Sequence, residues 1–340
     1  MTLRQNAWLR AQAILLITMA WLCAAASLDS QTAQEKPKAS ESAAQIRRRV
    51  ELVNVDVAVT DRRGNFIRDL KPENFRVLDN GAEQPITYFA PVDEPAAVLL
   101  LLEVSPAVFL IRQQHLEAAQ ALLDGLAADD WVAVGTYDKA AALRLRMTQD
   151  KRAAQQALLS PAYGLGMGQL NLSDGVSEAL RWLKEIPAKK AVVLISTGLD
   201  TSAEARWEAL RNELRASEVA IFAIGLGGEL RDFKGRNRPG EKDAALSFEQ
   251  ATRLLETIAE TTGGLAYFPR TAKEFPAIYS EIAQILRHRY SLGFAPPVRD
   301  GRFHRIEVQV VTGNEPPSAA KQRPDLRILA RYGYIAPAQD

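Results

Sequence analysis

The sequence predicts an α/β protein in which a mostly parallel sheet, covered by helices on both faces, lies between two short β segments. Three observations predict this fold. Continuous apolar runs such as Val98–Leu102 alternate with amphipathic stretches in the middle of the chain. Apolar and polar residues alternate singly on either side of that region. The chain also has 340 residues, which is enough for two domains.

Residues 1–26 have the order of a secretory signal peptide. Arg4 and Arg10 precede an apolar run that ends at Leu22, and small residues follow up to Ala26. The run is shorter than the roughly 20 residues of a membrane span, so we expect export, cleavage and no stable membrane span. The alternatives are a retained membrane anchor and acylation of Cys23, although a small residue, not Leu22, would be expected before an acylated cysteine.

Residues 27–46 follow as a polar segment rich in Gln, Lys, Glu, Ser and Ala. Such a composition cannot bury enough apolar surface to offset the entropy lost on ordering. We therefore expect a disordered linker between the site of export and the folded part of the protein.

Bulk charge and cysteine content exclude several classes of protein. The formal net charge is +1, so no overall field favours nucleic acid as a partner. Cys23 is the only cysteine, which excludes a disulfide within the chain and a thiolate metal cluster.

Residues 47–93 predict a small antiparallel β segment. Residues 53–60 alternate valine with mostly polar residues, as in a strand with one buried face. A second strand is predicted at Phe75–Leu78, and Asp79-Asn80-Gly81 is a hairpin signal because Asn and Gly accept positive φ. Pro85–Phe89 is expected to be the return strand.

Residues 94–289 alternate strands with helices. An antiparallel edge strand is expected at Ala140–Met147. The other predicted strands are Val98–Leu102, Trp131–Tyr137, Ala191–Ile195, Val219–Ile224 and Leu265–Phe268. The predicted helices are Gln114–Leu126, Ser173–Ile186, Ala203–Ser217, Phe248–Thr261 and Ala272–Arg287.

Residues 290–337 return to β structure, with strands expected at Tyr290–Phe294, Arg302–Val311 and Leu326–Tyr334. No helices accompany these strands, and residues 47–93 are too few for a stable sheet of their own. The simplest arrangement pairs the two β segments in one sandwich, with the α/β domain inserted between them.

Several motifs in order along the chain resemble a von Willebrand factor A domain. They are Val98–Ala107, Asp130–Asp138, Leu172–Val176, Val192–Asp200, Val219–Gly225 and Thr262–Gly264. The flanks, with Tyr290–Phe294 and Ala330–Tyr334, are similar to an exported family of such proteins that is abundant in Acidobacteria. The resemblance spans residues 50–337 and implies a Rossmann-like fold.

The resemblance also implies a divalent cation at the carboxyl ends of the strands, held by Asp-x-Ser-x-Ser, a Thr and an Asp from three loops. This chain departs from that pattern. Ser105 is retained, but Glu103 stands for the first Asp, Ala107 for the second Ser and Thr197 for the Asp of the third loop. The Thr of the second loop falls near Leu170. Nearby oxygen donors are Gln169, Asn171 and Ser173 on the same loop, and Asp200, which is not usually a direct ligand in the family.

Two interpretations of these loops remain open. In the one we prefer, the loops only cap the sheet and Glu103 is solvated or hydrogen-bonded to backbone amides, because a hard dication needs more oxygen and charge than is present. No cofactor is then expected. In the alternative, Glu103, Ser105 and Thr197 form a weak, rearranged site for Mg²⁺ or Ca²⁺.

No enzyme motif accompanies the fold. His115, His288 and His304 are not near one another in sequence, and we expect His304 to point outward from its strand. No nucleophile elbow, phosphate loop or dinucleotide fingerprint is present. A hydrolase using Glu103 and Ser105 is the rival hypothesis from the enzyme class, and it lacks a visible base or oxyanion hole.

Ligands of open α/β sheets bind outside the carboxyl ends of the strands. We call the three loops there, Glu103–Val108, Gly164–Ser173 and Ser196–Thr201, the crest. The sequence predicts a periplasmic or secreted, non-enzymatic protein that binds a protein partner of the cell envelope or exterior through the crest. The alternatives are metal-dependent adhesion and a structural role in an envelope assembly. The predicted contact residues are Glu103, Ser105, Gln169, Asn171, Ser173, Thr197 and Asp200.

Overall fold

The computed structural model describes residues 52–109, 112–159, 169–202, 204–226, 241–311, 323 and 325–338. All of these residues belong to one compact unit, Val50–Asp340. The expected signal peptide and linker lie outside the described residues, as does the stretch Gly164–Gly168 of the crest.

The described residues form several helices, whose lengths and hydropathy decide whether they could span a bilayer. None of them is both long enough and apolar enough to cross a membrane.

The central sheet has six strands in the order β10-β9-β8-β5-β6-β7. All neighbours in it are parallel except β7, which runs antiparallel to β6 as the sequence predicts. Every residue of β5 is buried, as expected for a strand covered on both faces. The bounds are β5 Ala97–Glu103, β6 Trp131–Tyr137, β7 Ala141–Thr148, β8 Lys190–Ser196, β9 Ala220–Gly225 and β10 Ala266–Tyr267.

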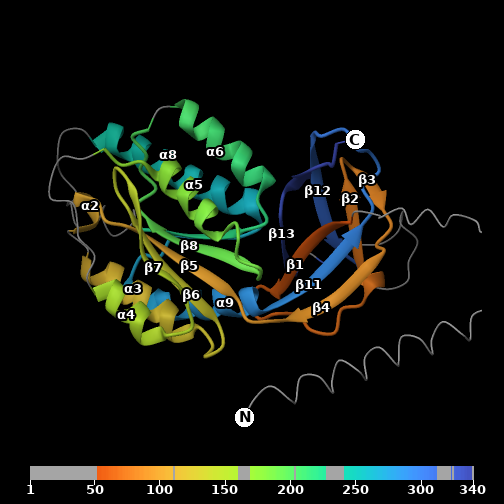
Figure 1. The fold of residues 1–340 in the computed structure, drawn as a ribbon, viewed down its shortest axis with the longest axis horizontal. Coiled ribbons are helices and arrows are strands. Elements are labelled where there is room, and N and C mark those ends of the chain that lie inside the picture. The colour runs from red at the N-terminus through yellow and green to blue at the C-terminus, as the bar shows by residue number, and fades with distance from the viewer. Residues whose placement is uncertain are drawn as a thin grey trace, which may run out of the picture. The chain divides into compact units, whose positions relative to one another are not determined.

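Helices cover both faces of this sheet (Figure 1). Val98, Leu100 and Leu102 of β5 contribute to the core that faces α3, α4 and α9. Leu99 and Leu101 contribute to the core that faces α5, α6 and α8. The bounds are α2 Pro106–Phe109, α3 Arg112–Gly125, α4 Lys151–Leu159, α5 Leu172–Leu183, α6 Glu204–Ala216, α8 Glu241–Thr262 and α9 Phe275–Arg287, the last preceded by a 3₁₀ turn at Ala272–Glu274.

Two four-stranded sheets, ordered β13-β1-β11-β4 and β14-β12-β2-β3, share a separate core of valine, isoleucine and aromatic side chains. A 3₁₀ turn at Pro72–Asn74 precedes β2. The bounds are β1 Val53–Asp61, β2 Phe75–Asp79, β3 Ala82–Gln84, β4 Tyr88–Asp93, β11 His288–Phe294, β12 Phe303–Val310, β13 Leu326–Ala330 and β14 Gly333–Ile335.

The two β segments are interleaved in these sheets. Strand β1 pairs with both β11 and β13, so it lies between two strands from the far end of the chain. The α/β part enters after β4 and leaves before β11, and these two strands pair antiparallel with His288 opposite Asp93. The fold class predicted from the sequence, a Rossmann-like α/β domain with a sandwich made from its flanking strands, is confirmed.

Several predicted elements differ in detail. The hairpin is present, with Asn80 at φ 49° and Gly81 at φ 84°, but its return strand is β3, not Pro85–Phe89. The strand breaks at Pro85, which has no N–H to donate, and the chain then joins the other sheet as β4. The predicted strand Leu326–Tyr334 is two strands, β13 and β14, in different sheets. Helix α4 was not predicted, and α8 begins at Glu241 rather than Phe248.

The expectation that His304 points outward is wrong. His304 shares the parity of Ile306, Val308 and Val310 along β12, so its side chain faces the sandwich core and is 5% exposed. Its Nδ1 lies 2.8 Å from Asp79 Oδ1, and its Nε2 lies 3.3 Å from Asp300 Oδ1. The Tyr334 hydroxyl donates to the other oxygen of Asp79 at 2.8 Å, which completes a buried polar network.

Candidate functional site at the crest

Glu103 is the last residue of β5 and is fully buried at the crest. The carboxyl ends of β5, β6 and β8 meet there because these strands are parallel. Their terminal residues therefore surround one carboxylate.

Both oxygens of this carboxylate accept hydrogen bonds. The Ser105 hydroxyl donates to Oε1 at 2.5 Å, and the Thr197 backbone N–H donates to Oε2 at 2.7 Å. The Thr197 hydroxyl lies 3.1 and 2.9 Å from the two oxygens, and the Ser196 hydroxyl donates to Oε2 at 3.1 Å. The lone pairs of Glu103 are thus occupied by donors from the protein itself.

Tyr137 and Ser196 extend the network beneath the carboxylate. The Tyr137 hydroxyl donates to Ser196 Oγ at 2.7 Å, and the Gly198 N–H donates to the same oxygen at 2.8 Å. Ser196 therefore accepts twice and directs its own proton toward Glu103. Burial, reinforced by the charge of Glu103, raises the pKa of Tyr137, so this hydroxyl keeps its proton and acts as a donor.

Two opposing effects act on the ionisation of Glu103. Burial disfavours the charged carboxylate and is the larger effect, while hydrogen bonds from Ser105, Thr197 and Ser196 favour it. The net result is a pKa raised above the usual value for a glutamate.

Asp200 forms a second, separate cluster in the crest. Its Oδ2 accepts from the backbone N–H and the hydroxyl of Ser173 at 3.0 and 2.6 Å, at the start of α5. Its Oδ1 accepts from the Ser202 N–H at 2.8 Å. A carboxylate at a helix N-terminus satisfies free amides and interacts favourably with the helix dipole. Asp200 thereby holds the third loop against the second.

The structure brings together Glu103, Ser105 and Thr197, and it places Asp200 with Ser173 instead. Sequence reasoning missed Tyr137, although this residue ends a predicted parallel strand and could have been found by that criterion. Ser196 was included in the crest, as the first residue of its third loop, but not among the predicted contact residues. Across the described ranges, no three His, Cys, Asp or Glu side chains are grouped as metal ligands would be.

Burial divides the predicted contact residues into two groups. Glu103, Ser105, Ser173 and Thr197 are at most 4% exposed, so they support the loops from beneath. Gln169 is exposed, and Asn171 and Asp200 are half-buried.

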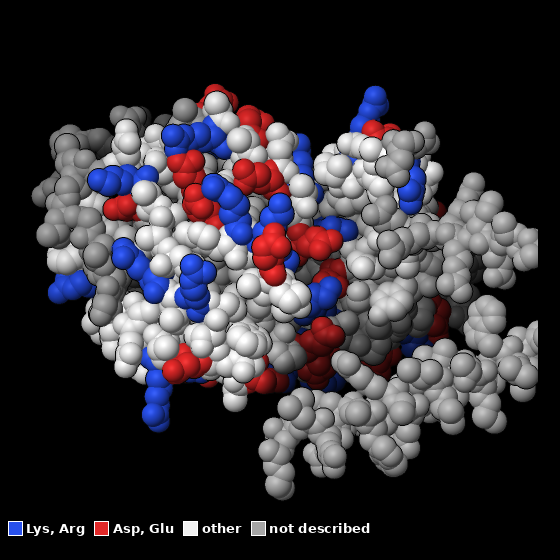
Figure 2. All heavy atoms as spheres, viewed as in Figure 1, with Lys and Arg blue, Asp and Glu red and all other residues white. Residues whose placement is uncertain are grey.

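Phe109 and Arg112 add an exposed pair that the sequence analysis did not identify. Phe109, at the end of α2, is 36% exposed, and the Arg112 guanidinium lies 4.7 Å from the centre of its ring. Acidic and basic side chains are interspersed over the face seen in Figure 2, with no large area of one sign.

The central part of the chain therefore has a Rossmann-like fold, in which a mostly parallel sheet is covered by helices on both faces and carries loops at its carboxyl edge. No family model and no curated protein matches the sequence. Several of the solved structures similar to this chain are described as von Willebrand factor proteins or domains. A von Willebrand factor type A protein from Catenulispora acidiphila is 12% identical with a TM-score of 0.46, covering 78% of this chain and 74% of its own.

Other similar structures match a smaller share of this chain. An aerotolerance-related membrane protein from Bacteroides fragilis is 16% identical with a TM-score of 0.41, covering 57% of this chain and 98% of its own. The von Willebrand factor domain of a type V pili tip protein from Porphyromonas gingivalis is 13% identical with a TM-score of 0.42, covering 57% of this chain and 95% of its own. At these values the likeness concerns the fold alone.

Proposed function

We propose that this protein is an exported, non-enzymatic binding protein that recognises a protein partner through its crest without a divalent cation. The observation that carries the proposal is the Glu103 carboxylate, which is fully buried and already accepts hydrogen bonds on both oxygens. The proposal of export depends on the signal-like order of residues 1–26.

The donor set at the crest does not fit a hard dication. Mg²⁺ needs close to six oxygen ligands, and Ca²⁺ needs six to eight. The Glu103 carboxylate points into a ring of hydroxyl and amide donors, and the Thr197 hydroxyl directs its proton at that carboxylate. An ion would have to displace these hydrogen bonds to gain a single charged ligand. Recognition at the crest would then depend on ordinary surface contacts.

The exposed surface of the crest, with the residues that directly follow its first loop, offers such contacts. Aromatic and arginine side chains are the residues that most often dominate protein interfaces, and Phe109 with Arg112 is a pair of this kind. Gln169 and Thr201 are exposed polar residues on the neighbouring loops. The rival hydrolase hypothesis has no such support, because Glu103 and Ser105 are buried away from any substrate.

Calorimetric titration of the full chain with Mg²⁺, Mn²⁺ and Ca²⁺ tests the role of metal. We expect no binding tighter than millimolar for the wild type or for Glu103→Gln. Tighter binding that is lost in Glu103→Gln would replace the proposal with metal-dependent adhesion.

Crosslinking in envelope extracts, with and without chelator, tests the binding role. We expect the same partner under both conditions, and less of it with Phe109→Ala. Trp131→Ala is the matched control, because Trp131 is an exposed aromatic at the opposite edge of the sheet, where β6 begins. Equal loss with both variants, or loss on chelation alone, would contradict the proposal.

A further inference from the structure

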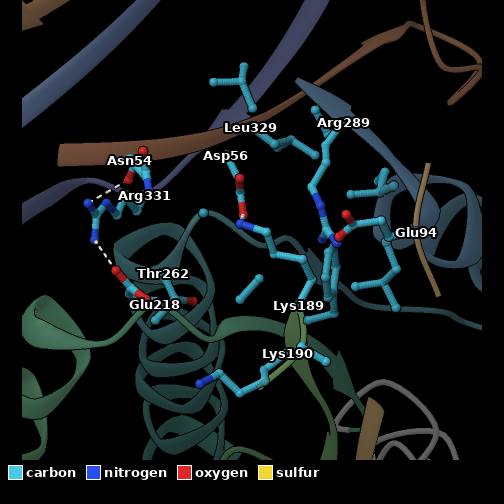
Figure 3. Close-up of a pocket in the computed structure, with 18 of the residues that line it drawn as sticks. Asn54, Asp56, Glu94, Lys189, Lys190, Glu218, Thr262, Arg289, Leu329 and Arg331 are labelled. Atoms are coloured by element: carbon cyan, nitrogen blue, oxygen red, sulfur yellow. Dashed lines mark hydrogen bonds and ion pairs between the residues drawn. The ribbon is translucent and has the colours of Figure 1, made fainter. Parts of the chain in front are cut away.

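A cavity of about 440 Å³ lies where the sandwich meets the amino-terminal edge of the central sheet. Strands β1, β11 and β13 line one side, and the chain before β8 and after α8 lines the other (Figure 3). Its volume falls within the range of small-molecule sites, which often occur between domains. No residue of the crest lines it, so this cavity is distinct from the proposed partner site.

Arg289 of β11 extends into this cavity (Figure 3). Its backbone is paired in the sheet opposite Val92, and the residue is only 9% exposed. Burial lowers the pKa of its guanidinium below the usual value, although an arginine still remains charged at neutral pH. A buried cation is therefore fixed to a rigid strand.

Two nitrogens of that guanidinium, Nε and Nη2, have no hydrogen-bond partner among the described residues. These two N–H groups lie on one edge of the guanidinium and form the parallel fork that binds a carboxylate or phosphate with two hydrogen bonds. Asp56 and Glu94 act on Arg289 through space, but neither forms a hydrogen bond with this edge. Leaving buried charged donors unpaired is costly, so the edge is suited to an external anion.

Asp56 provides a complementary feature in the same cavity. Its Oδ2 accepts from Lys189 Nζ at 2.6 Å, while its buried Oδ1 has no partner among the described residues. A free carboxylate oxygen is an acceptor and suits a ligand that carries an N–H or O–H group.

The charges that line the cavity limit the anion further. Four basic and three acidic side chains leave one net positive charge: Lys189, Lys190, Arg289 and Arg331 against Asp56, Glu94 and Glu218. A singly charged group is neutralised by this lining, whereas a doubly charged phosphate would face three nearby carboxylates.

Arg331 is not needed to explain the anion site. Its Nη2 donates to the Asn54 carbonyl at 2.6 Å, and its Nη1 lies 3.9 Å from Glu218 (Figure 3). Arg331 Nε also has no partner among the described residues, but Nη2 on the same edge is used by Asn54, so that edge of Arg331 is not an open fork. Arg289 is the arginine of the cavity whose Nε and Nη2 both lack a partner in the described part of the chain.

We propose that this cavity binds a small molecule that carries a carboxylate, held by the Nε–Nη2 edge of Arg289, together with a hydroxyl or ammonium group that donates to Asp56 Oδ1. The site is independent of the crest, so the protein has two binding regions with different partners.

Calorimetry on the full chain tests the proposal with glycine, glycolate and lactate as probes, against acetate and inorganic phosphate. We expect saturable binding of at least one donor-bearing acid, tighter than acetate. Arg289→Lys keeps the charge but removes the fork, so binding should weaken by at least about tenfold. Arg253→Lys, an exposed arginine paired with Glu249 on α8, is the matched control and should bind as the wild type does.

Asp56→Asn tests the second contact. We expect it to reduce the preference for glycine and glycolate over acetate, because the amide no longer offers the same charged acceptor. In the unsubstituted chain, labelling of arginine Nε should show by NMR one side-chain resonance that moves on saturation with the bound acid.

Each opposite result overturns the proposal. Absence of saturable binding for every carboxylate would do so, as would Arg289-dependent binding of phosphate alone. Equal affinity in Arg289→Lys and Arg253→Lys would remove the assigned role of the fork. If Arg289→Lys does not fold, an NMR titration in which no arginine Nε resonance moves would decide against the site.

Discussion

The crest and the cavity each contain a buried charge, but the protein treats the two charges differently. At the crest, Glu103 accepts hydrogen bonds from hydroxyls and an amide on neighbouring strand ends. In the cavity, Arg289 presents two N–H groups that nothing in the described protein accepts. The comparison shows that a buried charge at the strand ends can be satisfied by the protein itself, while a buried charge in the cavity retains open donors.

Burial alone does not distinguish these two cases, because both side chains are at least nine-tenths buried. The difference lies in the partners. A satisfied charge stabilises its surroundings and leaves little for a ligand to gain, whereas an unsatisfied charge costs free energy that a ligand can recover. Substitutions at the two positions should therefore have opposite consequences.

Glu103→Ala should have the largest effect. It leaves the Thr197 amide and the hydroxyls around it without their acceptor and opens a cavity, so we expect a loss of about 3–4 kcal/mol in the free energy of unfolding. Urea denaturation measures the loss. Glu249→Ala, on the exposed side of α8, should change stability by less than about 0.5 kcal/mol. A loss below about 1 kcal/mol for Glu103→Ala would mean that the network at the crest does not stabilise the fold.

Asp79→Ala extends the comparison to the sandwich, where another buried carboxylate is satisfied. His304 and Tyr334 would both lose their acceptor, and we expect a loss of about 1–3 kcal/mol. Asp79→Asn keeps one acceptor oxygen and should cost less. Equal stability of the wild type and Asp79→Ala in urea would show that this network contributes nothing.

Glu103→Gln tests the ionisation of the crest carboxylate. Because the folded pKa of Glu103 is raised, the folded protein holds this proton more tightly than the unfolded chain does. Its contribution to stability is fully present below the unfolded pKa and declines as pH rises through the raised folded pKa. The glutamine of the variant does not titrate. The free energy of unfolding of the wild type, measured relative to Glu103→Gln, should therefore fall as pH rises from the unfolded pKa through the folded pKa of Glu103. Paired urea titrations across pH measure the difference, and the opposite slope would show that hydrogen bonding outweighs burial.

Arg289→Met should have the smallest effect on stability. Replacing a buried, incompletely paired charge by an apolar side chain of similar length is often neutral or stabilising, so we expect a change within about 1 kcal/mol, or a gain. A loss of more than about 3 kcal/mol would mean that Arg289 is fully paired in solution, as Glu103 is.

Much of the fold could be predicted from the sequence because strand burial leaves a direct signal. The run Val98–Leu102 is apolar on both faces, and the Asn80-Gly81 turn requires positive φ that few residues adopt. The prediction for His304 was wrong because His304 lies two residues before Ile306 and therefore on the same face of the strand. The return strand was misplaced because Pro85, which lacks an N–H, was included in it. The error at His304 concerns the alternation of side chains along a strand, in which a shift by one residue moves every side chain to the other face.

The sites were less predictable, for a different physical reason. Glu103, Ser105 and Thr197 were identified because their loops follow recognisable strands. The hydrogen bonds that Glu103 accepts from Tyr137 and Ser196 depend on how those strand ends pack together. Arg289 gave no sequence signal, because its burial depends on the contact between the sandwich and the central sheet, which no local pattern encodes.

The position of β1 between β11 and β13 bears on how the chain acquires its structure. During synthesis this strand emerges early, and the strands that it pairs with, β11 and β13, are made much later. The central sheet and its helices, whose contacts are more local, can assemble first. The sandwich then closes around β1 at the end, so truncation of the carboxyl terminus should leave an apolar edge open to aggregation.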